Sequence, residues 1–416
     1  MMAPPECALW REKTVQTKEM PVGKGLFADD QVDLELLRKY AFWRWGALPP
    51  DVIPLTAADP DFPVAQEIRQ AIKVHAEGGL LGYGPTEGIA GFREIAARTA
   101  AERHGLSCTP DLIMPTGGAA AAMWIVAKYA LQPGDQAIIF DPVDLLFGLS
   151  VDAAGGRRVY SPVDRGTGAF DLEGMRALIT PRTRLLCLCN PHNPLGRVLT
   201  RDELTTIAQI AVEHDLLIMS DEVWSDIVYK PNSHISIATL GPEVAARTVS
   251  IYGLSKTFAL AGLRVGFLVA PDRAMFRRLD AVARVLGAGF GITTLGQVAG
   301  MAAYEDCWYW AEAFLDHLRE VRDVAVQRLN GIPGVRCLTP EGTYVLFPDV
   351  SRFGKGSAEM TDYLLREARV MTVPGTVEWF GPGAAGHIRL CFSTSMAIMR
   401  EALDRLEDAL SRLGSR

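Results

Sequence analysis

The sequence predicts an α/β fold with a mostly parallel central sheet and a smaller α+β domain. Short apolar runs of strand size recur through the middle of the chain, at 137–140, 185–189, 216–219, 249–252 and 265–270. Amphipathic segments such as 201–214 lie between several of these runs. Strands that alternate with helices form a parallel sheet covered by helices on both faces.

The chain has 416 residues, which is enough for two domains. Residues 1–30 show weak periodicity and are expected to form an N-terminal arm. We expect residues 51–290 to form the large domain, and residues 31–50 together with 291–416 to form the small one.

Apolar residues recur at helical spacing both before and after the segments of the predicted sheet. Before the sheet, helices are expected at 33–45, 64–77, 92–104 and 119–129, with a short apolar run at 52–55. After Pro271 the chain is strongly helical to about Leu329. The last part mixes two helices with short strands, expected at 335–338, 343–347 and 388–392.

Composition and charge argue against several classes of protein. The formal net charge is −7, whereas a nucleic-acid-binding protein normally carries a basic surface, so no nucleic-acid partner is expected. The longest apolar stretch, 119–131, is interrupted by Lys128 and is too short to span a membrane. The N-terminus has no apolar signal region, so we expect a cytoplasmic protein. The seven cysteines show no paired metal-ligand spacing; Cys187 and Cys189 alternate in one run and should point the same way.

The stretch around Lys256 carries the first chemical signal. A strand-like run ends at Tyr252, Gly253 breaks it, and Ser255 and Lys256 follow in the turn. A partly desolvated lysine amine can attack a carbonyl. Ser255 and the later Arg264 could hold a phosphate, which arginine binds with two parallel hydrogen bonds. Pyridoxal 5′-phosphate (PLP) is an aldehyde that carries a phosphate. The alternative is an ordinary solvated loop lysine.

Other segments should converge with Lys256, because ligands of open parallel sheets bind at the carboxyl ends of the strands. Gly118 and Ala119 begin a helix, where backbone N–H groups and the helix dipole favour a phosphate; a plain helix-entry turn is the alternative. Asn193 lies in the segment 190–197, in which two Asn-Pro pairs make a rigid loop. Its amide could contact a phenolic oxygen or a carboxylate.

Two charged residues complete the expected site. Asp221 follows the apolar run 216–219, and a carboxylate there can keep a pyridine nitrogen protonated, which makes the ring an electron sink. A helix N-cap aspartate is the alternative. Arg389 alternates with apolar neighbours on an expected strand. A buried arginine needs an anion, which either a substrate α-carboxylate or a structural ion pair would supply.

These residues carry a resemblance to a known family. The order Tyr83, Gly118, Asn-Pro-His-Asn-Pro-Leu-Gly, Asp221, Ser-Lys256, Arg264 and Arg389 resembles the class I/II aminotransferases, which are fold type I PLP enzymes. The resemblance covers about residues 50 to 410. It implies a three-layer PLP-transferase-like fold and a PLP-dependent aminotransferase that acts on an L-α-amino acid.

The resemblance also implies roles. Lys256 would carry the cofactor as an internal aldimine and move the proton between Cα and C4′. Asp221 would pair with the pyridine nitrogen and Asn193 would contact the ring O3′. Arg389 would bind the α-carboxylate, and Tyr83 would reach the phosphate of a neighbouring subunit in a homodimer. The phosphate would be held by Gly118, Ala119, Ser255 and Arg264.

Two stretches, 58–62 and 191–198, resemble the C–S β-lyase branch, which shares the fold. Ala58, Asn193 and Arg389 are the expected substrate contacts. Two expected cofactor contacts depart from the family. Asp144 stands where an aromatic ring usually stacks on the cofactor, unless Phe147 takes that place. Trp224 stands where a tyrosine or histidine usually bonds O3′, and an indole N–H can donate but cannot act as a base.

The reaction itself stays open. Transamination is the default, and β- or γ-elimination or replacement is the alternative within the same chemistry, which the two departures favour slightly. A non-catalytic binding protein on this scaffold has no need of Lys256, Asp221, Asn193 and Arg264 together. A nicotinamide-dependent enzyme would need a Gly-x-Gly-x-x-Gly after a first strand, and none is present.

Overall fold

The computed structural model describes residues 25–46, 48–286 and 292–414. The expected N-terminal arm therefore lies outside the described residues as far as residue 24. Its remaining part packs on the body of the protein. The ring of Phe27 lies 5.0 Å from the ring centroids of both Phe62 and Trp310, and 5.2 Å from that of Phe314.

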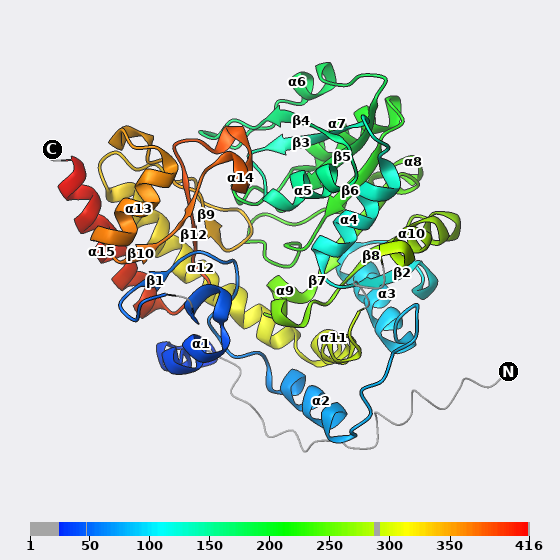
Figure 1. The fold of residues 1–416 in the computed structure, drawn as a ribbon, viewed down its shortest axis with the longest axis horizontal. Coiled ribbons are helices and arrows are strands. Elements are labelled where there is room, and N and C mark those ends of the chain that lie inside the picture. Colours follow the sequence, from blue (N-terminus) through cyan, green and yellow to red (C-terminus); the bar gives the residue numbers. More distant parts are fainter. Residues whose placement is uncertain (1–24, 47, 287–291, 415–416) are drawn as a thin grey trace.

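A seven-stranded sheet forms the centre of the larger part (Figure 1). The five adjacent strands from β4 (Arg157–Pro162) to β7 (Thr248–Gly253) run parallel, and β8 (Gly266–Val269) is antiparallel to both of its neighbours. This confirms the predicted mostly parallel sheet. The spatial order is β2 (Ile113–Thr116), β8 (Gly266–Val269), β7 (Thr248–Gly253), β6 (Leu217–Asp221), β5 (Thr183–Cys189), β3 (Gln136–Asp141) and β4 (Arg157–Pro162).

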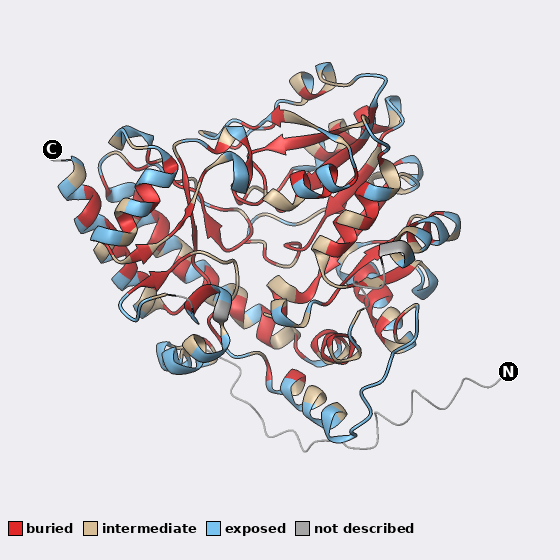
Figure 2. Ribbon diagram, in the orientation of Figure 1, coloured by how far each residue is buried: buried red, intermediate tan, exposed pale blue. Residues whose placement is uncertain are grey.

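Helices cover both faces of this sheet, so that the strands are buried between them (Figure 2). Side chains of α4 (Ala119–Ala130), α5 (Leu145–Ala153) and α10 (Arg273–Leu286) share one apolar cluster with Cys187 and Cys189. The opposite cluster holds side chains of α6 (Leu172–Ala177) and α7 (Arg201–Glu213). The two thiols of β5 therefore point the same way, as their spacing predicts.

A third apolar cluster spans the rest of the molecule. The 24-residue helix α12 (Trp308–Gly331) extends from the larger part into the smaller one (Figure 1). The remaining helices of the larger part are α2 (Gln66–Glu77), α3 (Ala90–His104), α8 (Pro242–Ala245), α9 (Leu254–Thr257) and α11 (Thr294–Asp306), and α12 spans Trp308–Gly331. Short 3-10 turns lie at η2 (Asp29–Gln31), η4 (Pro110–Leu112), η5 (Ile237–Leu240), η6 (Ala261–Leu263), η7 (Ser351–Phe353) and η8 (Pro382–Ala384).

The smaller part is built on two short sheets. One is antiparallel, in the order β11 (Val373–Pro374), β12 (Ile388–Cys391) and β9 (Val345–Leu346). In the other, β1 (Ile53–Pro54) pairs in parallel with β10 (Val370–Met371). Its helices are α1 (Leu34–Tyr40), the π-helix η3 (Phe42–Gly46), α13 (Ser357–Glu367), α14 (Val377–Phe380) and α15 (Met396–Gly414).

The strand predicted at 335–338 is wrong. Only Arg336 pairs there, in an isolated bridge to Asp349. The side chain of Asn330 forms hydrogen bonds with both backbone polar groups of Cys337: it accepts from the N–H at 2.8 Å and donates to the C=O at 3.0 Å. Those two backbone groups are then no longer available for the hydrogen bonds between β-strands. Over the described ranges, no helix has the length and apolarity that crossing a membrane requires.

Candidate active site

Lys256 lies in α9, at the carboxyl edge of β7. Its Nζ donates to the Ala58 carbonyl at 2.7 Å and sits 5.2 Å from the centroid of the Trp224 ring. Burial lowers the pKa of Lys256, while the nearby carboxylates of Asp59 and Asp144 act in the opposite sense. Lys256 is half-buried, so its amine is partly removed from bulk water, which is the condition a lysine nucleophile needs.

Asp221 ends β6, the strand beside β7, and is paired in register with Ile251. Its Oδ1 accepts from the Val223 N–H at 3.1 Å. Burial raises the pKa of Asp221 to about 7. A buried carboxylate with so little hydrogen bonding gains from a cationic N–H partner, and a protonated pyridine nitrogen is such a partner.

The glycines around α4 bring its N-terminus against the sheet. Gly118 caps α4 with φ +94°, and a Cβ built on Gly266 would lie 3.1 Å from its Cα. A Cβ on Gly253 would lie 3.7 Å from Ser255 Oγ and 3.8 Å from the Cβ of Ala119. The first N–H groups of a 12-residue helix and the Ser255 hydroxyl therefore lie together, which suits a phosphate.

Two expected cofactor contacts lie on the surface of the chain. Arg264 precedes β8 in the left-handed region, with φ +51°, and is exposed. No hydrogen bond or ion pair joins its guanidinium to the other described residues. Tyr83, in the segment between α2 and α3, is fully exposed, so the described part of one chain does not bring it into the site.

Asp144, Asn193 and Arg389 meet in one cluster. Asn193 Nδ2 donates to Asp144 Oδ2 at 3.0 Å, and the backbone N–H of Asp144 donates to the Asn193 carbonyl at 3.2 Å. Arg389 Nη1 lies 4.0 Å from Asp144 Oδ2 and donates to Asn193 Oδ1 at 3.4 Å. Asp144 Oδ1 also caps α5 by accepting from the Leu146 N–H at 3.1 Å. Phe147 is buried in the apolar cluster under α5.

Trp224 lies under the amine. The residue is 2% exposed, and its ring meets the ring of Tyr344 edge-on, with centroids 4.6 Å apart. Its position 5.2 Å from Lys256 Nζ allows a cation–π contact when the lysine is charged.

Sequence reasoning missed the residues that hold the segment around Ala58 in place. Arg44 donates from Nε to the Pro54 carbonyl at 3.1 Å and pairs with Asp61 at 3.1 Å. Tyr344 donates its hydroxyl to Ala58 O at 3.3 Å. Because Arg44 and Asp61 lie on opposite sides of a Pro-rich turn, nothing in their local sequence signals the buried pair.

A buried polar network ties the strand end that carries Asp221 to the turn that carries Lys256. Glu222 accepts from Tyr252 Oη at 2.5 Å and from Ser236 Oγ at 2.7 Å. The hydroxyl of Thr257, the residue after Lys256, donates to Asp226 at 3.1 Å. The sequence offered no signal for this network beyond the polar character of its members.

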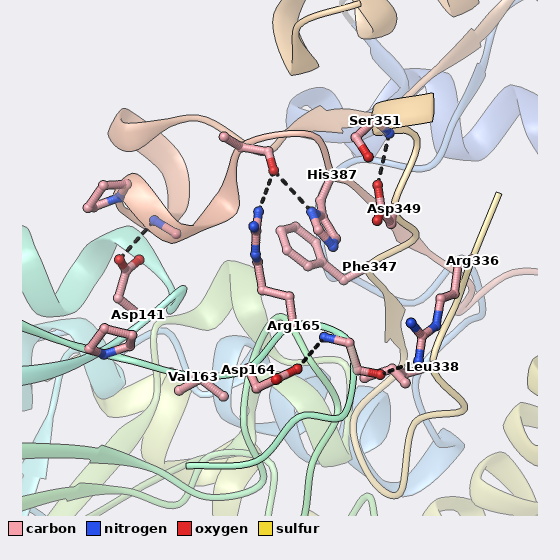
Figure 3. A pocket seen from close by; sticks show the side chains of 15 residues that line it. Asp141, Val163, Asp164, Arg165, Arg336, Leu338, Phe347, Asp349, Ser351 and His387 are labelled. Carbon is pink, nitrogen blue, oxygen red and sulfur yellow. Dashed lines mark hydrogen bonds between the residues drawn. The ribbon is translucent and has the colours of Figure 1, made fainter. Parts of the chain in front are cut away.

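A cavity of about 550 Å³ lies between the loop after β4 and the smaller part (Figure 3), and Lys256 is not among the residues that line it. Arg165 crosses it and donates to the Ala385 carbonyl at 2.6 Å. At its edge, Asp141 accepts from the Gly383 N–H at 2.8 Å, and burial raises the pKa of Asp141 to about 6. Neither Lys256 nor Asp221 therefore belongs to the lining of this cavity.

Comparison with known proteins agrees with this geometry. The family described as "Aminotransferase class I and II" matches residues 50–406. The chain belongs to the class I and II aminotransferase family. This confirms the family, the fold class, the enzyme class and PLP as the cofactor, and the desolvated Lys256, the buried Asp221 and the N-terminus of α4 fit that cofactor.

Three similar proteins locate the chain within the family. It is 30% identical over 363 residues to the aspartate aminotransferase of Pyrococcus horikoshii, covering 86% of this chain and 91% of that protein. It is 29% identical over 365 residues to the cystathionine beta-lyase PatB of Bacillus subtilis, covering 87% and 93%. The structure of the aromatic aminotransferase from Pyrococcus horikoshii superposes with a TM-score of 0.81 at 31% identity, covering 91% of this chain and 99% of that one.

Proposed function

We propose that this PLP-dependent aminotransferase-family enzyme transaminates an L-α-amino acid, with Lys256 as the amine that attaches to the cofactor and as the base at Cα. The observation that carries the proposal is the position of Lys256 Nζ, desolvated and 2.7 Å from the Ala58 carbonyl, beside the strand end that bears Asp221. A lowered lysine pKa increases the share of the amine that is neutral and able to take a proton.

Bound PLP supplies an aldehyde and a protonated ring that accepts the electrons released at Cα. In the proposal, Asp221 keeps the ring nitrogen protonated and Asn193 faces O3′. Trp224 and Asp144 flank the ring. The phosphate is held by Gly118, Ala119, Ser255 and Arg264. Arg389 binds the substrate carboxylate beside Ala58 and Asn193.

We propose that the active unit is a cytoplasmic homodimer in which Tyr83 reaches the phosphate in the partner subunit. The support is its exposure: Tyr83 is fully exposed, and Leu80 and Leu81 beside it are 86% and 64% exposed. Apolar side chains grouped in this way on one segment favour a protein partner. The domain division proposed is 51–290 for the large domain and 31–50 with 291–416 for the small one. At its two boundaries the domains are tied together, because β1 pairs with β10 of the smaller part and α11 packs against α2 and α3 of the larger part.

β-Elimination is the second candidate. Its support is the likeness to the cystathionine beta-lyase, together with Trp224, which cannot accept a proton where the family has a tyrosine or histidine. A non-catalytic binding protein is the third candidate, and it requires that no cofactor binds at Lys256.

The deciding experiment records the visible spectrum of the purified enzyme with a panel of L-amino acids and identifies the products by mass. Transamination predicts the pyridoxamine form and a keto acid. Elimination predicts ammonia with a released thiol or other leaving group. The Lys256→Ala variant serves as control and should lose both the absorption band and turnover. A wild-type protein without that band would refute the proposal.

A further inference from the structure

The carboxylate of Asp144 lies beside the groups that the proposed function assigns to a substrate carboxylate. Its Oδ2 accepts from Asn193 Nδ2 at 3.0 Å and lies 4.0 Å from Arg389 Nη1. A guanidinium is among the donors that bind a free carboxylate most strongly, and an amide N–H adds a further hydrogen bond. We call Asn193 and Arg389 the carboxylate site.

Arg389 has little else to balance its charge. Its guanidinium donates to the Thr56 carbonyl at 3.0 Å and lies 5.2 Å from the Phe380 ring, and both partners are neutral. Within the described ranges, Asp144 is the only carboxylate within 4.0 Å of it. A buried arginine needs an anion, and Asp144 at 4.0 Å meets part of that need before any ligand arrives.

Asp144 is held in this place by the backbone. Its N–H donates to the Asn193 carbonyl at 3.2 Å, and its Oδ1 accepts from the Leu146 N–H at the start of α5. The carboxylate therefore cannot leave the carboxylate site without also giving up the cap of the helix. An incoming carboxylate has to share one guanidinium with it, and two like charges in one buried site repel.

We propose that Asp144 is a specificity-determining residue that weakens the preference of this enzyme for a carboxylate at Arg389. The inference rests on the proposed function only in taking Arg389 as the place where that group of the ligand binds. Because the Asp144 carboxylate offsets part of the guanidinium charge, a neutral carboxamide loses less relative to a carboxylate than it would at an unpaired arginine. The substrate class therefore extends from amino acids to amino compounds that carry an amide beside the amino-bearing carbon.

The test compares two non-reacting ligands that differ only in that group, hydrocinnamate and hydrocinnamamide. Calorimetry gives their dissociation constants for the enzyme with and without cofactor, so the readout is independent of turnover. We expect the wild type to prefer the acid by less than about tenfold. Asp144→Asn keeps a good helix cap but removes the charge. In this variant the acid should bind at least about tenfold more tightly, a gain of about 1.4 kcal/mol, while the amide changes less than about twofold.

Asp171→Asn is the matched control, because Asp171 caps α6 by accepting from the Gly174 N–H at 2.8 Å and is exposed. Its ratio of acid to amide affinity should equal that of the wild type. Asp144→Ser, which also caps, repeats the test if the asparagine variant is unstable. If the affinity for hydrocinnamate rises in neither of the two Asp144 variants, the inference is overturned. Failure of the proposed function would instead appear as a missing visible band, with the acid-to-amide ratio still measurable.

Discussion

Replacement of Asp221 by asparagine should stabilise the cofactor-free protein at pH 8 and weaken its response to the cofactor. Burial raises the pKa of Asp221 from 3.8 to about 7. The folded protein therefore binds this proton more tightly than the unfolded chain. The resulting contribution to stability is complete below pH 3.8 and is lost as the pH rises to about 7.

The magnitude follows from the shift. Each pKa unit is worth about 1.4 kcal/mol, so the ionised carboxylate costs the cofactor-free protein up to about 4 kcal/mol at pH 8. The asparagine side chain of the variant would keep the acceptor for the Val223 N–H and carry no charge. Bound cofactor offsets the cost in the wild type, because its protonated ring nitrogen pairs with the carboxylate, and the variant has no such gain.

Urea unfolding at pH 5 and pH 8, with and without PLP, measures both effects. The variant should unfold at higher urea than the wild type at pH 8 without cofactor, and the difference should shrink at pH 5. PLP should raise the midpoint of the wild type more than that of the variant. If the cofactor-free variant is no more stable than the wild type at pH 8, Asp221 does not carry a buried charge and the reasoning is wrong.

Three further substitutions test other parts of the structure. Arg44→Leu should destabilise the protein by about 3–5 kcal/mol in urea unfolding, because it leaves Asp61 buried without its ion-pair partner, and an unchanged midpoint would contradict the pair. Tyr252→Phe should cost about 1.5–3 kcal/mol by removing a donor from the buried Glu222 carboxylate; a neutral effect would mean that the hydrogen bond adds nothing. Gly118→Ala meets no atom within 4 Å but must adopt φ +94°, so it should cost about 1–3 kcal/mol and raise the PLP dissociation constant; tight PLP binding in this variant would argue against the helix N-terminus as the phosphate site.

The central strands and most of the candidate site could be predicted because their signals are local. Parallel strands buried on both faces are continuous apolar runs, and each predicted run in the middle of the chain overlaps a strand. The edge strands β2 and β4 were not predicted. The strand β4 is only partly buried and begins with Arg157 and Arg158, so it lacks the apolar run that marks an inner strand.

The sequence by itself determined the family, the sheet and the residue types around Lys256, because those depend on short patterns along the chain. Only the tertiary structure decided which distant groups meet. Asp144 could be recognised as a departure, but its bond to Asn193 and its approach to Arg389 arise from the packing of β3, β5 and β12 segments that are far apart in the chain. The pair of Arg44 with Asp61 and the desolvation that lowers the pKa of Lys256 are likewise products of burial, which is a property of the assembled fold.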